Sequence, residues 1–438
     1  MWRIAAPLIL SNISVPLLGM VDAGVLGHLD SAGYLAGVSL AGAVFSLIFM
    51  GMNFLRMGTT GMTAQAFGRN DGDALRETLG QGLICALGIA AALILLRQPI
   101  GTLAWQLMAA DADTTAAAAI YFDIRILGAP FTLINYVLIG WFIGVKDGRS
   151  PLLLVLTSNS VNIVLDLLLV NGLGWRSDGV ALASVVAEAS GNVVGLWLVA
   201  RKLNTIPGQW QQRALTTIRA YRGFFAVNAN IFVRTMALIG TLSFITSQGV
   251  RFGQAVIAAN AILMNLFYVL SYALDGLAQA AEALVGEAWG ARNRRALRDA
   301  VRASLIWSLA TAGLFVIVFA AGGPLLIDLL TSIDTVRINA REYLPWMIVA
   351  PLICVWSFLF DGVFVGTTWA REMRNVMVVS AIVVFVPTWW LSYALGNHGL
   401  WLSFTAFMTA RASGMALIYR RRINQPPITD WPANAAAR

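Results

Sequence analysis

Long apolar runs broken by short polar clusters repeat along the whole chain. The run LICALGIAAALILL (83–96) is typical, and polar clusters return about every 25 to 40 residues, a spacing suited to helices that cross a bilayer. Only helices and closed barrels satisfy their backbone hydrogen bonds in lipid, and the sequence lacks the ten-residue alternation of a barrel. The pattern therefore predicts an all-α polytopic membrane protein with twelve transmembrane helices, centred near residues 16, 48, 87, 134, 160, 189, 235, 268, 311, 353, 384 and 409.

The composition agrees with this pattern, and the distribution of charge adds an orientation. Of the 438 residues, 58% are hydrophobic and 12% are charged, whereas about a quarter of a soluble protein is charged. The formal charge of +8 comes mostly from basic residues in alternate loops, as in the cytoplasmic loops of membrane proteins. We therefore predict that both termini are cytoplasmic, that the basic tail RRRIN (420–424) contacts membrane lipid, and that nucleic acid is not a partner.

Two pairs of segments indicate an internal repeat. TAQAFGRNDGDAL (63–75) aligns with VGEAWGARNRRAL (285–297), and GWFIGVKDGR (140–149) aligns with GVFVGTTWAR (362–371). Both alignments have the same shift in numbering, from 63 to 285 and from 140 to 362, which we call the repeat offset. A unit of six spans keeps its orientation when it is duplicated, and transporters often bind substrate between such parallel repeats. We predict an N-terminal six-helix bundle over 1–200, a cytoplasmic linker over 201–222, a C-terminal six-helix bundle over 223–422 and a cytoplasmic tail over 423–438.

Polar side chains inside the spans of the first half are candidate functional residues. Asn162 and Asp166 lie four residues apart, on one face of the predicted fifth helix. A carboxylate at the centre of a lipid-facing helix costs roughly 3 kcal/mol, so it needs compensation or has a function. Asp22 lies in the first helix after Pro7 and Pro16, each of which favours a bend. Intramembrane acids of this kind are candidates for proton or cation binding.

The second half carries acids of its own. Asp275 and Glu282 lie two turns apart on the predicted eighth helix, and Asp361 lies on the tenth. They could hold a cationic substrate, relay protons, or pair with Arg56 or Arg234, which also lie within spans. These alternatives stay open at the level of the sequence.

Seven segments, spread over both halves, resemble the multidrug and toxic compound extrusion (MATE) family, in its DNA-damage-inducible F-like branch: IAAPLIL, VDAGVLGHLD, TTGMTAQAFGRND, VNIVLDLLL, GVALASVVAE, YALDGLAQAAEALVGEAWGARN and FDGVFVGTTWAREMRN. The resemblance implies two pseudo-symmetric six-helix bundles around a V-shaped central cavity. It also implies that Asp22, Asn162, Asp166 and Ser184 form a cation-coupling site, with Ser184 where relatives often have Thr. Another branch couples to sodium through an acid on the tenth helix, which would be Asp361 here. The alternative that Asn162, Asp166 and Ser184 only link helices stays open.

These observations lead to one functional hypothesis with three alternatives. We expect a monomeric secondary active exporter in the plasma (bacterial inner) membrane that exchanges organic cations for protons and needs no cofactor. A sodium-coupled antiporter, with Na⁺ at Asp22, Asn162 and Asp166, is the nearest alternative. A flippase for a lipid-linked precursor would need a strongly cationic cavity, and an intramembrane aspartyl hydrolase lacks a recognised motif here. Glu188 on the sixth helix is a further candidate, and no phosphate-binding GxxxxGK[ST] loop is present.

Overall fold

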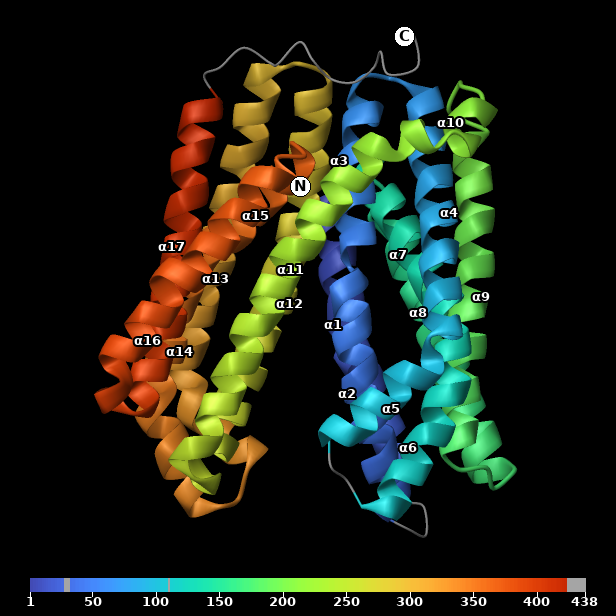
Figure 1. The fold of residues 1–438 in the computed structure, drawn as a ribbon. Helices are drawn as coiled ribbons and strands as arrows, with labels where there is room; N and C mark the ends of the chain where they lie inside the picture. Colours follow the sequence, from blue (N-terminus) through green and yellow to red (C-terminus); the bar gives the residue numbers. More distant parts are fainter. Residues whose placement is uncertain (27–31, 109–110, 424–438) are drawn as a thin grey trace.

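A computed structural model describes residues 1–26, 32–108 and 111–423, without the side chains of 15–23, 25–26 and 32–34. The described residues are almost entirely helical and include no strand, which confirms the predicted all-α class. The helices of the described residues group into twelve long segments. These segments run between the two ends of the molecule (Figure 1). Ten of them are long and apolar enough, among the described residues, to cross a membrane. Each predicted centre falls inside one of the twelve segments.

The first six segments form one bundle, and the last six form another. The first bundle contains α1 (Trp2–Leu26), α2 with α3 (Ala32–Met52, Phe54–Gly68), α4 (Gly72–Leu95), α6 with α7 (Ala112–Arg125, Ala129–Gly144), α8 (Arg149–Asp166) and α9 (Ser177–Leu203). The second contains α11 (Arg222–Gly249), α12 (Gln254–Gly290), α13 (Arg294–Leu330), α14 (Asp334–Gly366), α15 with α16 (Ala370–Val379, Val386–Ser392) and α17 (Asn397–Arg422). The short helices α5 (Arg97–Met108) and α10 (Gln212–Thr216) lie between longer ones.

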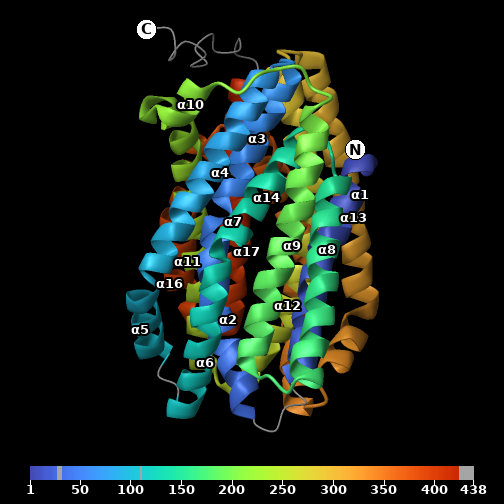
Figure 2. The ribbon, with the colours of Figure 1, turned by 90° about the vertical axis from the view of Figure 1, so that its right-hand side faces the viewer.

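Each bundle has an apolar core of its own. One core centres on α2, α4 and α7, and the other on α12, α14 and α17. The bundles meet where α12 packs against α1 and α3, and their helices diverge toward the opposite end (Figure 1). The side view shows the first bundle in front of the second over the height of the molecule (Figure 2). This arrangement confirms the two bundles in a V shape that the family resemblance implied.

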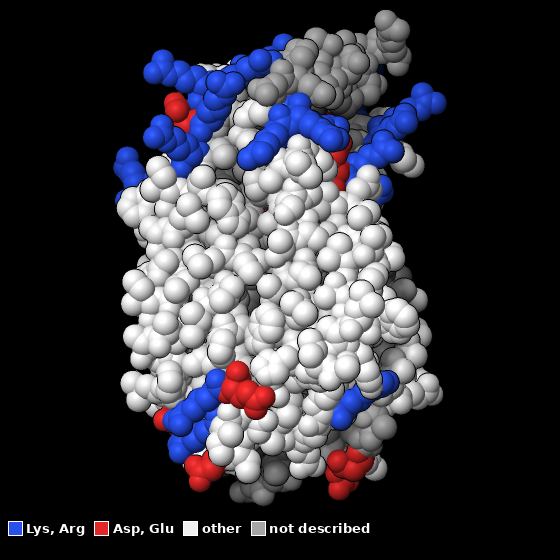
Figure 3. Space-filling model, turned by 90° about the vertical axis from the view of Figure 1, so that its left-hand side faces the viewer, with Lys and Arg blue, Asp and Glu red and all other residues white. Residues whose placement is uncertain are grey.

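Charged side chains on the surface drawn in Figure 3 gather at the two ends of the molecule. On the face that Figure 3 shows, a broad belt without Lys, Arg, Asp or Glu separates a strongly basic end from one with mixed charges. We call the first of these the basic end; it holds the connections at 69–71, 145–148, 291–293 and 367–369. The apolar belt is the surface that a bilayer covers.

Helix starts and turns at the basic end follow the repeat offset found in the sequence. Asp71 caps α4 by accepting a hydrogen bond from the backbone N–H of Ala74, at 3.0 Å. Asn293, its equivalent in the second half, caps α13 in the same way through Ala296, also at 3.0 Å. The left-handed residues that precede these caps, Asn70 (φ 54°) and Arg292 (φ 53°), are also separated by the repeat offset. The two halves therefore share backbone geometry as well as sequence.

Glycines pack the helices of each bundle at equivalent positions. A Cβ on Gly140 would lie 2.4 Å from the carbonyl oxygen of Arg56. A Cβ on Gly362 would lie 2.5 Å from the carbonyl oxygen of Ala278, and both residues of this contact follow those of the first by the repeat offset. Only glycine allows α7 to approach α3, and α14 to approach α12, this closely.

The connection between the bundles is fastened to the first one. Residues 201–222 include the end of α9, the short α10 and a 3₁₀ turn over Ile218–Tyr221. The guanidinium of Arg76 on α4 donates to the carbonyl oxygens of Leu203 and Ile206, both at 2.9 Å. A buried arginine thus holds the start of the segment that was predicted as a linker.

Candidate functional site

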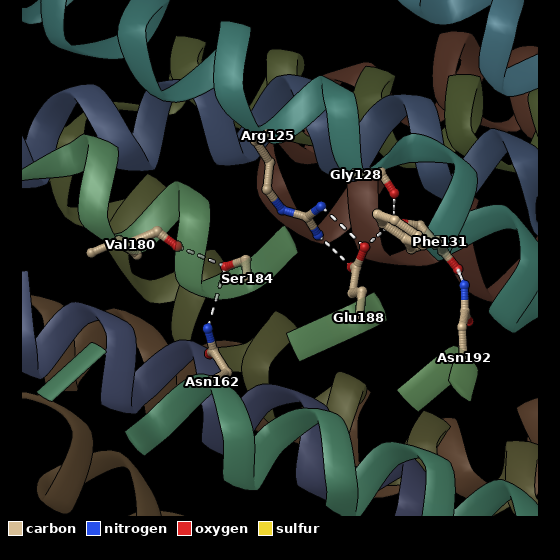
Figure 4. Close-up of polar contacts among 9 residues, drawn as sticks. Arg125, Gly128, Phe131, Asn162, Val180, Ser184, Glu188 and Asn192 are labelled. Atoms are coloured by element: carbon tan, nitrogen blue, oxygen red, sulfur yellow. Dashed lines mark hydrogen bonds and ion pairs between the residues drawn. The ribbon is translucent and has the colours of Figure 1, made fainter. Parts of the chain in front are cut away.

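Three of the four predicted coupling residues are described with their side chains, and they lie on the adjacent helices α8 and α9. Asn162 is 1% exposed, and Asp166 is completely buried. The amide nitrogen of Asn162 reaches the hydroxyl oxygen of Ser184 at 3.5 Å, and that hydroxyl donates to the carbonyl of Val180 at 3.0 Å (Figure 4). The structure therefore brings Asn162 and Ser184 together, with Asp166 one turn further along α8.

The fourth residue, Asp22, belongs to α1, and its side chain lies outside the described part of the structure. Its backbone level follows from the packing of α1 beside α8. A Cβ on Gly148 would meet the carbonyl oxygen of Ile4, and Asn159 donates to the carbonyl of Ser14 at 3.3 Å. The two contacts align α1 and α8 in one register, and the same register places Asp22 level with Asp166.

The backbone changes character at Asp166. Regular α8 ends there, and a π-helical turn follows over Leu167–Gly172. Such turns are frequent at functional sites. Pro7 and Pro16 lie within α1, whose helix is continuous from Trp2 to Leu26, and their role in bending stays a prediction.

A polar stripe on α9 extends the site toward α6 and α7. Glu188 follows Ser184 by one turn, and its carboxylate contacts Arg125 at 2.5 and 3.2 Å and the hydroxyl of Thr132 at 2.5 Å (Figure 4). Asn192, a further turn along, donates to the carbonyl of Phe131 on α7 at 3.1 Å. Sequence reasoning had considered Glu188 and missed Arg125, a basic residue inside an otherwise apolar span, which was the available signal.

The acids of the second bundle face arginines. The carboxylate of Asp361 on α14 contacts Arg234 of α11 and, at 2.9 Å, Arg411 of α17. Both arginines are buried. Of the alternatives raised for Asp361, this geometry supports the structural ion pair. Arg411 was missed, although it too is a basic residue in a predicted span.

Glu282 belongs to a contact between the bundles. Its carboxylate, on α12, lies 3.4 Å from the guanidinium of Arg56 on α3. Glu282 is 2% exposed, so this ion pair is shielded from solvent. Asp275 lies two turns earlier on the same helix and is half-buried. Sequence analysis had named Arg56 as a possible partner for these acids, and the structure assigns it to Glu282.

An all-helical membrane protein, built from two six-helix repeats with polar clusters buried in each, has the architecture of a secondary transporter. The MatE family model matches residues 7–168 and 231–391, one match in each half, and the chain belongs to this family. It is 43% identical to DNA damage-inducible protein F of Escherichia coli (strain K12) over 422 residues, which cover 96% of this chain and 92% of that protein. The protein is therefore a transporter, and the alternative of an intramembrane hydrolase is wrong.

More distant relatives agree with this family assignment. The probable multidrug resistance protein NorM of Caulobacter vibrioides is 24% identical over 99% of this chain and 92% of its own length. A solved structure described as the outward-facing conformation of a multidrug resistance MATE family transporter has a TM-score of 0.86 at 19% identity, covering 96% of this chain and 94% of that one. The likeness to this solved structure shows the fold alone.

Proposed function

We propose that the protein is a multidrug exporter that exchanges organic cationic or amphipathic compounds for protons, with sodium as the alternative ion. The names of several relatives point to multidrug efflux. The observation that carries the proposal is the complete burial of Asp166, one turn from Asn162 and level with Asp22. A buried negative charge is costly, and a bound cation, such as a proton, neutralises it.

The coupling step follows from this burial. When Asp166 and Asp22 are protonated, the pocket carries less charge, α1 is free to bend at Pro7 and Pro16, and the site releases its hold on substrate. Asn162 and Ser184, joined by their hydrogen bond, add an amide and a hydroxyl beside the acid, one turn from Asp166. Arg125 is matched by Glu188, so its charge is balanced within the same bundle. The same oxygens would coordinate Na⁺ in the sodium-coupled alternative.

We further propose that the basic end faces the cytoplasm, with both termini on that side. The bundles meet near this end and diverge from it, so the structure corresponds to the outward-facing state of the exporter (Figure 1). The moving units in this proposal are residues 1–200 and 223–422, joined by the linker over 201–222 and followed by a tail over 423–438.

In the second bundle, Asp275 is the acid that we assign to substrate. Asp361 faces two arginines, and Glu282 faces Arg56, whereas the contacts of the described residues include no ion pair for Asp275. A half-buried carboxylate suits an organic cation, because partial desolvation strengthens their attraction. The flippase alternative is disfavoured, since Arg56, like the two arginines at Asp361, already faces an acid.

Reconstituted protein tests the coupling. Efflux of ethidium, a fluorescent organic cation, is measured from proteoliposomes under an imposed pH gradient and then under an imposed sodium gradient. Asp22→Asn and Asp166→Asn should each abolish gradient-driven efflux, whereas Asp113→Asn, at an exposed helix start, should leave it unchanged. Undiminished efflux by both site variants would refute the mechanism, and a response to sodium alone would replace the proton with Na⁺.

A further inference from the structure

The two bundles touch at the basic end through a contact that obeys the internal repeat. A Cβ on Gly68 of α3 would lie 2.1 Å from the carbonyl oxygen of Glu287 on α12. A Cβ on Gly290 of α12 would lie 2.2 Å from the carbonyl oxygen of Gln65 on α3. The repeat offset separates Gly68 from Gly290, and it also separates Gln65 from Glu287. The contact is therefore two-fold pseudo-symmetric, and α3 and α12 are pressed together backbone to backbone.

The side chains of Gln65 and Glu287 extend the same symmetry to two loops. The amide of Gln65 donates to the carbonyl of Gly366, the last residue of α14, at 2.9 Å, and to the hydroxyl of Thr368, in the loop that follows, at 3.2 Å. The carboxylate of Glu287 accepts from the ammonium of Lys146 at 2.7 Å, in the loop after α7. Lys146 and Thr368 are again separated by the repeat offset. Each bundle thus holds one loop of the other.

Both loop residues adopt a left-handed backbone. Lys146 has φ 60° and Thr368 has φ 55°. A β-branched residue such as Thr seldom adopts this conformation, which persists only where surrounding contacts enforce it. Backbone hydrogen bonds of the two helix-ending turns hold it, from Asp147 to Phe142 and from Trp369 to Phe364, both at 2.9 Å, so matching turns present the two side chains to the opposite bundle.

We propose that Gln65, Gly68, Lys146, Glu287, Gly290 and Thr368 form a latch that keeps the basic end closed and sets the equilibrium between the two access states. The proposal rests on the proposed function only in requiring that the bundles separate at this end. Every contact of the latch crosses between the bundles, so all of them break together when the basic end opens. Contacts inside each bundle, such as Gly140 on Arg56, are untouched by that motion.

The two halves of the latch differ in chemistry. Gln65 is 1% exposed and makes neutral hydrogen bonds. The side chains of Lys146 and Glu287 are each 31% exposed, and their ion pair is open to screening by salt. High ionic strength therefore weakens one half of the latch and leaves the other intact.

Alanine at either glycine tests the latch. A new Cβ near 2.1 or 2.2 Å from a backbone oxygen forces the helices apart, so Gly68→Ala and Gly290→Ala should both favour the state that is open at the basic end. Combining them should add little, because one separation relieves both clashes. Gly88→Ala and Gly313→Ala are matched controls, since a Cβ at either position meets nothing within 4 Å.

The separation is measured directly by pulsed electron resonance between spin labels. Cysteines replace Arg149 and Arg371, exposed residues at equivalent positions of the two bundles, in a chain with Cys85→Ala and Cys354→Ala. We expect one dominant distance in the unaltered latch and a long-distance fraction that rises about tenfold, from a minor population, in each glycine variant. Unchanged distances in both variants, with the controls folded, would overturn the proposal.

A second pair of variants applies if the alanines prevent folding. Raising the salt concentration should increase the long-distance fraction of the parent chain, and Lys146→Gln or Glu287→Gln should raise it and remove its salt dependence. Distances that ignore both salt and these substitutions would equally refute the latch. Ethidium efflux is recorded in parallel: efflux without any response of the distances contradicts the latch, whereas responsive distances without efflux contradict the proposed function.

Discussion

Replacing Asp361 should destabilise the second bundle more than any surface substitution. Its carboxylate is the common partner of Arg234, which is 7% exposed, and Arg411, which is 2% exposed. Asp361→Asn would leave both guanidiniums buried without that counter-charge. Removing one partner of a buried pair costs about 3–5 kcal/mol, and here two cations lose the same acid, so we expect at least this cost.

Thermal unfolding of purified protein in detergent provides the measurement. Glu372→Gln is the matched control, because the side chains of Glu372 and Arg422 are 21% and 30% exposed, and such pairs contribute about 0–1 kcal/mol. Arg234→Gln should cost less than Asp361→Asn, since the pair between Asp361 and Arg411 survives. Combining Asp361→Asn with Arg234→Gln should recover part of the lost stability, because one buried cation is then removed.

The order of these stabilities tests the structural role of Asp361. If Asp361→Asn melted at the same temperature as Glu372→Gln, the two arginines would not depend on this carboxylate. If instead it abolished ion-driven transport without loss of stability, Asp361 would be a coupling residue, and the ion-pair interpretation would be wrong.

Three further predictions concern the first bundle. Glu188→Gln weakens the charged hydrogen bonds to Arg125, so thermal unfolding should show a loss of about 1.5–3 kcal/mol, and an unchanged melting temperature would contradict the pairing. Ser184→Ala removes the acceptor of Asn162, and should weaken ion binding by about 1 kcal/mol, seen as a shifted pH dependence of efflux that Ser184→Thr does not show. Arg76→Met removes charged hydrogen bonds to the end of α9 and should cost about 1.5–3 kcal/mol for each bond lost, measured by thermal unfolding against Arg371→Met, an exposed control.

The spans could be predicted from sequence because a bilayer imposes one length on every helix that crosses it. All twelve centres fall in helical segments, and the repeat offset reappears in caps, in turns and in the glycine contacts. The pairing of charges inside the bundles could not be predicted in the same way. Hydropathy indicates how deep a residue lies in the membrane, but it does not indicate which helices pack against each other. Arg125 and Arg411 were therefore missed, although each is the partner of an acid that had been noticed.

Only part of the candidate site could be predicted from the sequence, for a related reason. Asn162 and Asp166 share a helix, so their common face follows from spacing alone. The contact with Ser184 depends on how α8 packs on α9, and the π-helical turn after Asp166 has no clear signature in the run LLLVNG. The role of Asp22 as a coupling residue stays a prediction that the transport experiment tests.

The contact of Gly140 with the carbonyl of Arg56, and that of Gly362 with the carbonyl of Ala278, show how two equivalent halves can differ in chemistry. Each contact restricts only the glycine; the residue across from it contributes a peptide oxygen, which every amino acid carries. A methyl side chain in one copy and a guanidinium in the other are therefore equally compatible with the scaffold. One half can therefore carry a charge at this position that the other lacks, while the helices of both halves pack in the same way.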